Sequence, residues 1–198
     1  MKPVRAFVAI PLPKAAIAWL VDLQGQLRKT GLRASWSKPE TMHLTIRFLG
    51  DVAPSRLDTL MDTLRVGYTA CSPVHLALGG ADAFPNRRRP SVIFAGIEVL
   101  AGDLTSLRRI ADDAAAEAGI PRDNQPFHPH VTLGRIRRDR PDAAALARFN
   151  AVLDSPRAHA DAIDVSSVSL FSSTLRPGGP VHDEIATYPL ARRKMETD

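Results

Sequence analysis

The sequence contains a single cysteine, Cys71, among its 198 residues. One cysteine cannot form a disulfide within the chain, which favours a reducing compartment. The apolar run at residues 4–10 is shorter than the hydrophobic region of a secretory signal, and no stretch approaches the ~20 apolar residues of a membrane-spanning helix. We therefore expect a soluble, cytoplasmic protein that does not associate with a membrane.

Glycine-rich phosphate loops are also absent. None opens any of the expected helices, so the sequence gives no support to a Rossmann or P-loop nucleotide site. The chain has no long linker and no low-complexity block, and its length suffices for one domain or for two small, closely packed lobes. No heptad pattern is present, and we therefore expect a monomer.

Four segments carry the apolar spacing of a helix with one buried face. They lie at residues 17–27, 57–68, 104–118 and 146–153. β-branched or alternating segments bounded by Gly, Pro, Asn or Ser predict strands at residues 4–10, 43–49, 74–79, 91–99, 130–136, 163–171 and 184–190. Because several strands follow one another without a helix between them, the pattern predicts antiparallel or mixed sheets and an α+β fold.

The formal net charge is +5, and much of the positive charge lies in two arginine clusters. The first comprises Arg87, Arg88 and Arg89, and the second comprises Arg135, Arg137, Arg138 and Arg140. On charge alone, two solvated loops and a binding surface for a polyanion are equally good interpretations. The second cluster begins beside the strongest motif in the chain, which favours an anionic ligand there.

That motif is a His-x-Thr tripeptide, and it occurs twice, as HLT at residues 43–45 and as HVT at residues 130–132. Both copies lie in expected strands. Side chains two residues apart project from the same face of a strand, so each histidine shares a face with its threonine. On the first strand, the opposite and apolar face is expected to carry Leu44, Ile46 and Phe48.

Two imidazoles beside one groove suit a reaction in which one proton is removed and another is supplied. Histidine is apt because its unperturbed pKa of ~6.5 leaves both protonation states populated near neutrality. We interpret His43 and His130 as an acid–base pair. We interpret Thr45 and Thr132 as hydrogen-bond donors to phosphoryl oxygens. One His-x-Thr in a strand is usually structural, but two copies in the same setting make coincidence a poor explanation.

A metal site is the alternative interpretation of these histidines. His43, His128 and His130 offer three potential ligands. No Asp, Glu or Cys lies beside them in the sequence to complete a site, and Pro129 separates the second histidine from the third. We therefore expect no metal ion and no other cofactor.

In these motifs and in the order of the segments around them, the chain closely resembles the 2H phosphoesterase superfamily. Within it, the chain is similar to the RNA 2′,3′-cyclic phosphodiesterase (2′-5′ RNA ligase-like) family. The segments that carry the resemblance span nearly the whole chain and are RAFVAI (5–10), Trp36, HLTIRFLG (43–50), FPNRRRPSVIFAGI (84–97), FHPHVTLGR (127–135) and LFSSTLRPGGP (170–180). Two positions depart from it: Val181-His182 stands where a tyrosine usually follows Gly-Pro, and Phe94 where the family tends to have Trp.

The resemblance implies a single domain over residues 1–198, made of two intertwined lobes related by a pseudo-two-fold axis. Two antiparallel sheets would flank a central cleft, with the helices on the outside. The resemblance also implies hydrolysis of 2′,3′-cyclic phosphates at RNA 3′ ends, such as those of tRNA fragments, to 2′-phosphomonoesters. The absence of an evident metal site makes this a metal-independent reaction in our interpretation.

By the same resemblance, His43 donates a proton to the departing 3′ oxygen and His130 activates water. Arg135 matches a family position that contacts the phosphate or the adjacent nucleotide. Strict alternation places Arg135 on the face opposite His130, so this role requires a bulge or the end of the strand. Phe84, which Pro85 and the arginines place in a loop, is the best candidate for stacking on a base.

Two other functions remain open from the sequence. The first is a phosphodiesterase of the same superfamily that acts on small cyclic nucleotides or on 2′-5′ oligonucleotides, including 2′-5′ RNA ligation. The second is a module that binds RNA ends without turnover, although such a module would not require either imidazole.

Overall fold

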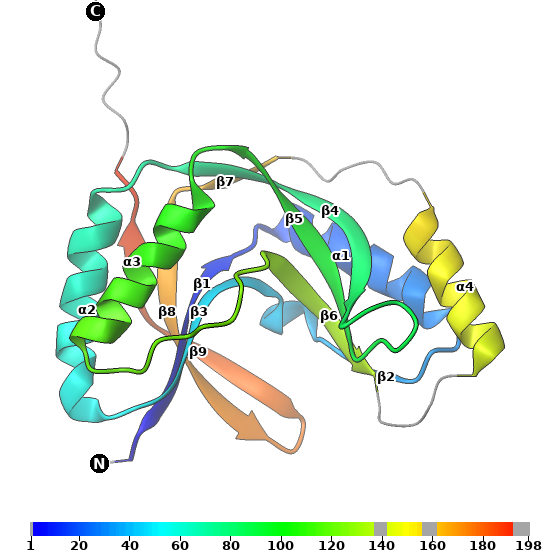
Figure 1. Cartoon of the computed structure of the whole chain (residues 1–198), viewed down its shortest axis with the longest axis horizontal. Helices are drawn as coiled ribbons and strands as arrows, with labels where there is room; N and C mark the ends of the chain where they lie inside the picture. Colours follow the sequence, from blue (N-terminus) through cyan, green and yellow to red (C-terminus); the bar gives the residue numbers. More distant parts are fainter. Residues whose placement is uncertain (1, 137–141, 156–161, 192–198) are drawn as a thin grey trace, which may run out of the picture.

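One curled antiparallel sheet runs through the molecule and joins its two halves (Figure 1). The computed structural model describes residues 2–136, 142–155 and 162–191. The strands are β1 (Val4–Pro11), β2 (Ala34–Trp36), β3 (His43–Val52), β4 (Val74–Phe84), β5 (Val92–Ala101), β6 (His130–Ile136), β7 (Ile163–Val165), β8 (Ser167–Arg176) and β9 (Gly179–Pro189). Within the described ranges they pair in the order β7-β4-β5-β6-β3-β1-β8-β9, and β2 pairs with β6 outside this order.

Helices flank the sheet on both sides. They are α1 (Lys14–Arg28), α2 (Pro54–Thr69), α3 (Leu104–Glu117) and α4 (Ala143–Asp154), and a 3-10 turn, η1 (Pro39–Thr41), precedes β3. α2 and α3 pack together against β3 and β9, whereas α4 packs against α1 and β4 (Figure 1). The chain crosses from one half of the molecule to the other more than once. β1 and β3 lie in one half, but β2, which comes between them in the sequence, pairs with β6 in the other half.

The predicted α+β class with antiparallel strands is confirmed. The two expected sheets are the two halves of one continuous sheet, with β4 to β7 on one side and β1, β3, β8 and β9 on the other. The halves are joined where β3 and β6 pair, at Leu44 and Val131. This narrow junction is the part of the fold that matters most for the site described below.

The four predicted helices are all present, and their apolar stripes pack in the core. In α2, the side chains of Leu60, Leu64 and Tyr68 are fully buried, as the 3.6-residue period requires. Asp103 precedes α3, and its carboxylate accepts a hydrogen bond from the N–H of Thr105 and so caps the helix. No helix in the described part of the chain is long and apolar enough to cross a membrane.

The segment 163–171, predicted as one strand, belongs to two strands in the structure. β7 pairs with β4 and β8 pairs with β1, so the chain changes from one half of the sheet to the other at Ser166. The sequence shows a continuous β-prone run because a change of pairing partner leaves no local signature. β2 was not predicted at all, since three residues are too few to show a period.

The prediction that Phe48 faces the core is wrong. The register between β1 and β3 shifts at two places, and the extra residues on β3 are Ile46 and Leu49. Such bulges reverse the alternation of side chains. Phe48 is consequently 44% exposed, with the guanidinium of Arg5 4.8 Å from its ring centroid, whereas Arg47 is turned into the interior.

Candidate active site

The two His-x-Thr motifs lie side by side at the junction of the two halves. Their middle residues, Leu44 in β3 and Val131 in β6, pair with each other. Because the strands are antiparallel, this register places the histidine of each motif across from the threonine of the other. The four polar side chains therefore lie on the same face of the sheet, at the point where the two strands meet.

Each motif histidine is oriented by a hydrogen bond to the backbone two residues before it. Nδ1 of His130 lies 2.6 Å from the carbonyl oxygen of His128. A carbonyl only accepts, so the Nδ1 carries the proton and the lone pair lies on Nε2 of the neutral ring. His43 makes a corresponding hydrogen bond with the backbone of Thr41. The two imidazoles are thus held in the same way, one on each strand.

Three rings surround His43, and we call Phe7, Phe171 and His182 the His43 cluster. The ring of Phe7 stacks on His43 with centroids 4.7 Å apart, and the ring of His182 meets His43 edge-on at 5.4 Å. Phe171 stacks on Phe7 at 5.4 Å. His43 and these three rings line a cavity of about 390 Å³.

Sequence reasoning did not assign a role to His182. This residue lies on β9, opposite Ser173 of β8, and its Nδ1 is buried without a hydrogen-bond partner among the described residues. The sequence feature that could have drawn attention to His182 was the departure from the tyrosine that the family usually has at this point of the chain. That β9 folds back along β8 and brings the ring to His43 is visible only in the structure.

Phe84, Phe94 and His128 form a second group of rings, the His130 cluster. Phe84 stacks on Phe94 at 4.2 Å, and the two rings lie 5.2 and 5.4 Å from the ring of His130. His128 lies 5.9 Å from Phe84. Phe84 is therefore in the candidate site, but it is the last residue of β4 and not a loop residue, and one face of its ring is already covered by Phe94.

Both motif histidines are difficult to protonate in the free protein. Burial, together with the neighbouring His182 and His130, lowers the pKa of His43 to about 4, against the opposing effect of the backbone hydrogen bond with Thr41. Burial also lowers the pKa of His130, assisted by the charges of His128 and Arg135. A bound anion would raise both pKa values again, because negative charge favours the imidazolium form.

Arg135 lies in the same cavity as Thr132, although strict alternation assigns it to the opposite face. The register between β5 and β6 shifts between Ile93 and Phe94, which leaves Leu133 as an extra residue on β6. This bulge turns Arg135 back toward the histidines, and Thr132 and Arg135 line one cavity of about 430 Å³. The remaining members of the second arginine cluster, Arg137, Arg138 and Arg140, lie outside the described residues.

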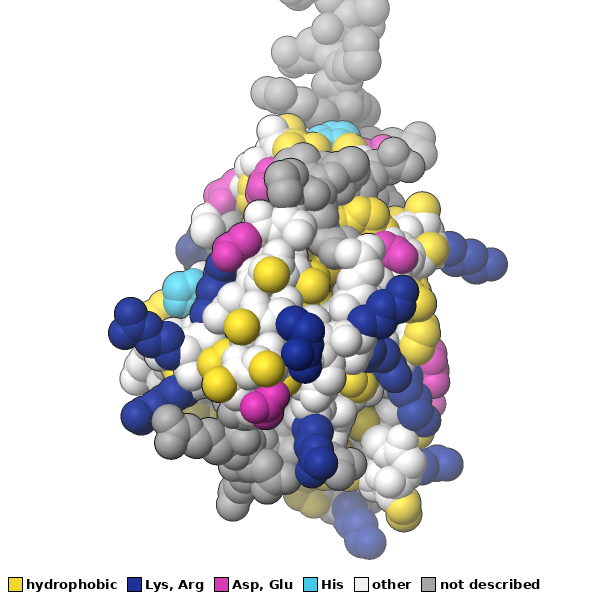
Figure 2. Space-filling model, turned by 90° about the vertical axis from the view of Figure 1, so that its right-hand side faces the viewer, with side chains coloured by type: hydrophobic (Ala, Val, Ile, Leu, Met, Phe, Trp, Pro, Cys, Tyr) yellow, Lys and Arg dark blue, Asp and Glu magenta, His cyan; other side chains and the backbone are white. Residues whose placement is uncertain are grey.

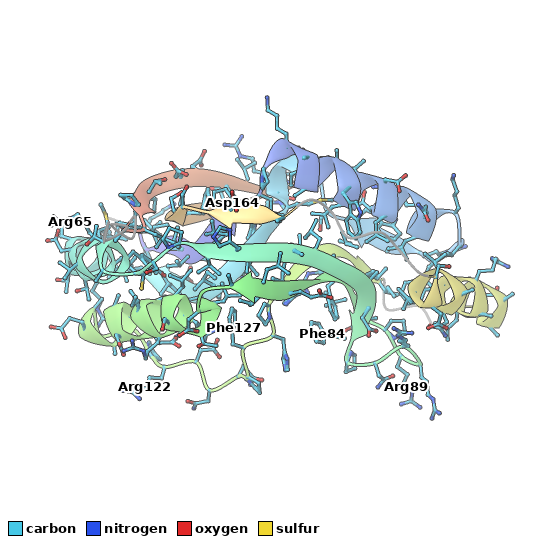
Figure 3. The ribbon with its side chains drawn as sticks, turned by 90° about the horizontal axis from the view of Figure 1, so that it is seen from above. Arg65, Phe84, Arg89, Arg122, Phe127 and Asp164 are labelled. Carbon is cyan, nitrogen blue, oxygen red and sulfur yellow. The ribbon has the colours of Figure 1, made fainter. Side chains whose placement is uncertain are left out.

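The first arginine cluster contains one structural residue. Nε of Arg87 lies 2.9 Å from Oδ1 of Asp82, and its Nη1 lies 2.6 Å from Oδ1 of Asp154. Arg87 thus joins the loop after β4 to the end of α4. The other two arginines are exposed. Figure 3 shows Arg89 on the loop beyond Phe84, and Figure 2 shows Lys and Arg side chains spread over this side of the molecule.

A buried arginine, Arg47, anchors the segment that leads into β6. Its Nη2 donates to the carbonyl of Pro121 over 2.7 Å, and its guanidinium lies 2.8 and 3.2 Å from the carboxylates of Asp112 and Asp123. Arg108 of α3 approaches the same carboxylates at 2.7 and 3.2 Å. The network joins β3 to α3 and to the loop before β6. Strict alternation would place Arg47 on the cleft face, which is why the sequence did not reveal this role.

The three histidines of the metal alternative do not form a ligand group. Within residues 2–136, 142–155 and 162–191, no three His, Cys, Asp or Glu side chains come together in a way that could hold a metal ion. His128 packs instead near Phe84, and its backbone carbonyl orients His130.

Known proteins resemble this chain over nearly its whole length. A family model described as LigT like Phosphoesterase matches residues 10–94 and 97–182. Proteins named RNA 2′,3′-cyclic phosphodiesterase from Methanothermobacter thermautotrophicus and Thermus thermophilus are 28% and 31% identical to the chain. These matches cover 94% of this chain in both cases, and 99% and 90% of the relatives.

Solved structures give the same fold. A crystal structure of a protein from Thermus thermophilus matches with a TM-score of 0.78 at 26% identity, covering 96% of this chain and 99% of that one. Each block of the family match contains one His-x-Thr motif, and the two blocks meet between β5 residues 94 and 97. Since the family match spans most of the sequence and includes both motif strands, the chain belongs to the LigT-like phosphoesterase family.

Proposed function

We propose that the protein hydrolyses 2′,3′-cyclic phosphates at RNA 3′ ends to 2′-phosphomonoesters, with His43 and His130 as acid and base and without a metal ion. The pairing of Leu44 with Val131 is the observation that carries this proposal. It brings two distant motifs onto one face, where a cyclic phosphate would have an imidazole on each side. Such an arrangement fits an in-line displacement at phosphorus, in which one proton is taken up and another is supplied.

The family and its named members support the general activity. Relatives called RNA 2′,3′-cyclic phosphodiesterase match this chain over nearly its full length and nearly theirs. The binding-module alternative is less well supported, because a pure binder has no need for two imidazoles that are each oriented by a backbone hydrogen bond. Exposed arginines beside the site suit an anionic RNA end.

In the proposed reaction, water attacks the cyclic phosphorus from the side opposite the 3′ oxygen. Nε2 of His130 accepts a proton from this water as the new P–O bond forms. His43 gives its proton to the 3′ oxygen as the old P–O bond breaks, and the product is a 2′-phosphomonoester with a free 3′ hydroxyl. The two histidines then exchange protons with solvent. The assignment of acid and base follows the family resemblance, because both rings are held alike.

The remaining site residues act on the charge of the phosphate. Thr45 and Thr132 are half-buried beside the histidines, and their hydroxyls can donate hydrogen bonds to the non-bridging oxygens. Arg135 places a positive charge in the cavity next to Thr132. The ring centroid of Phe84 lies 5.2 Å from that of His130, and we assign this half-buried ring to packing against the bound nucleoside.

A direct test is incubation of the purified protein, in EDTA, with a short RNA that ends in a 2′,3′-cyclic phosphate. We expect conversion to a 2′-phosphate, identified by mass and by phosphatases that distinguish 2′ from 3′ ends. The reaction should proceed at the same rate with and without EDTA, because the proposed acid, base and hydrogen-bond donors are all side chains. A rate that collapses in EDTA and returns with Zn²⁺ would overturn the metal-free mechanism.

The pH dependence of kcat/KM should peak on the acid side of pH 6.5, the ordinary histidine pKa. The productive state carries one proton on the pair, since one ring must be neutral and the other charged. Both pKa values are lowered in the free protein, so the pair holds one proton between about 4 and the depressed pKa of His130. In most molecules that proton is on His130, and the productive form, with the proton on His43, is a minor tautomer that has the same pH dependence. Below this range both rings are protonated, and above it both are neutral. An optimum on the alkaline side of pH 6.5 would contradict the arrangement.

Substitution of His182 gives a matched test of this profile. Protonated His182 lowers the pKa of His43, so His182→Gln should raise that pKa and move the acid limb to higher pH. His128→Gln should move the alkaline limb to higher pH for the same reason, because His128 lowers the pKa of His130. Burial is the larger cause in both cases, so each shift should be under about one pH unit. His75→Gln, at an exposed position on β4, serves as the control.

A further inference from the structure

The cavity lined by Thr132 and Arg135 adjoins the catalytic face, because Thr132 belongs to both, and we call it the outer groove. Its walls come from three parts of the chain: Thr132 and Arg135 on β6, Trp36 and Lys38 on the segment that includes β2, and the tip of the β8–β9 hairpin at residues 177–180. In Figure 1 this hairpin tip and the β2 end of β6 lie on the same lower side of the molecule. The outer groove therefore extends from Thr132 to the hairpin tip.

The charged side chains that line the outer groove are cations. Lys38 and Arg135 are exposed, and neither forms an ion pair within the part of the chain that the structure describes. The described lining includes no Asp or Glu. The charge of Arg135 also reaches the catalytic centre, because it lowers the pKa of His130. The groove thus offers two positive charges beside the site that takes the cyclic phosphate.

The hairpin tip leaves room for an anion near these cations. Nζ of Lys38 lies 3.9 Å from the position that a Cβ at Gly178 would occupy, so the ammonium reaches across the groove to the tip. Gly178 and Gly179 carry no side chains, and a phosphate can approach the backbone there closely. The lysine and the bare backbone therefore face the same small space.

Trp36 forms a wall of the outer groove and not a platform for a base. The guanidinium carbon of Arg28 lies 5.3 Å from its ring centroid. On β6, a Cβ at Gly134 would lie 2.9 Å from Cε3 of Trp36, which shows how tightly the ring rests on that strand. With the indole engaged in this way, the groove is suited to recognise charge and not the identity of a base.

We propose that the outer groove binds the phosphodiester that joins the terminal nucleotide of the RNA to the nucleotide before it. This inference rests on the proposed function, because it places the terminal cyclic phosphate at His43 and His130. Thr132 belongs to both sites, and Arg135 lies about 10 Å further along β6. The strand leaving the catalytic face meets Arg135 and Lys38 next. The protein accordingly prefers a cyclic phosphate on an oligonucleotide over the same group on a mononucleotide.

The test compares three substrates with the full-length protein. The first is a mononucleotide 2′,3′-cyclic phosphate, the second is a dinucleotide with the same end, and the third is that dinucleotide with a neutral methylphosphonate as its internal linkage. We expect kcat/KM for the dinucleotide to exceed that for the mononucleotide by about tenfold or more, as for a charge-assisted hydrogen bond. The methylphosphonate should lose most of this advantage, because it keeps the nucleoside and removes only the charge.

Variants identify the groove as the source of the preference. Lys38→Gln should lower the ratio of the dinucleotide to the mononucleotide kcat/KM by about tenfold. It should also reduce the dependence of the dinucleotide KM on salt, by a slope of about 0.7 for one phosphate contact. Lys29→Gln is the matched control, since Lys29 is exposed at the end of α1 and outside the groove lining. It should leave the ratio unchanged.

The outcomes separate the two proposals. Equal kcat/KM for the mononucleotide and the dinucleotide overturns the groove while the proposed function stands. An advantage of the dinucleotide that survives both the methylphosphonate and Lys38→Gln also overturns it, because contacts to the second nucleoside then explain the preference. No turnover of any of the three substrates overturns the proposed function, and the groove assignment falls with it.

Discussion

His43→Ala and His130→Ala should each lower kcat for an RNA 2′,3′-cyclic phosphate by about 10²–10⁴-fold, with a much smaller change in KM. Each substitution removes either the proton donor or the proton acceptor of a single displacement, so the loss falls on the transition state. The double variant should be little worse than the more damaged single variant, because groups that act in one step are not additive. Single-turnover and steady-state kinetics on the same RNA measure all three losses.

His75→Ala is the control for these variants. His75 is an exposed histidine on β4 whose Nδ1 lies 2.6 Å from Oδ1 of Asp164, and Figure 3 shows Asp164 apart from Phe84. Its loss should leave kcat unchanged, and circular dichroism should show that all variants are folded. A folded His43→Ala or His130→Ala protein with a kcat close to that of the parent would show that the corresponding imidazole takes no part in the chemistry.

Arg47→Met should lower the free energy of unfolding by about 2–4 kcal/mol, which is among the largest effects expected of any single change in the fold. Arg47 is 4% exposed and holds two carboxylates and the carbonyl of Pro121. Its removal leaves these acceptors facing an apolar side chain. The carboxylates of Asp112 and Asp123 retain some solvent access, which limits the loss. Urea denaturation followed by circular dichroism measures the change.

The exposed pair of Arg65 and Asp62 provides a matched control for this experiment. Nη2 of Arg65 lies 2.8 Å from Oδ1 of Asp62, the same separation as in the pair of Arg47 and Asp112, but both side chains are mostly exposed. Arg65→Met should therefore change stability by no more than about 0.5 kcal/mol. Equal effects of Arg65→Met and Arg47→Met would mean that burial of the network does not stabilise the fold.

The candidate catalytic residues could be predicted from the sequence because the signals that identify them are local patterns. A histidine and a threonine two residues apart share a face of any extended strand, and a stripe such as Leu60, Leu64 and Tyr68 identifies a helix and its buried face. The α+β class followed from strands that succeed one another without a helix between them. These features depend on backbone periods of 2 and 3.6 residues, which hold regardless of what the rest of the chain does.

Whether the two motifs meet was decided by tertiary structure alone. The pairing of Leu44 with Val131 joins segments far apart in the chain, and no local preference fixes such a partner or its register. The same holds for the strand that divides at Ser166 between the two halves of the sheet. His182 enters the site only because β9 folds back along β8.

Bulges explain why the sequence could not predict the face of the sheet toward which some side chains point. One extra residue in β3 turns Arg47 inward and Phe48 outward, and one extra residue in β6 returns Arg135 to the face of the histidines. A bulge arises from how two strands match each other, so alternation counted along one strand fails beyond it. The sequence alone identified the candidate side chains and predicted that strands present them. The pairing of β3 with β6, and the bulges on both, decided which of these side chains face one another, because non-local pairing and not local propensity sets register.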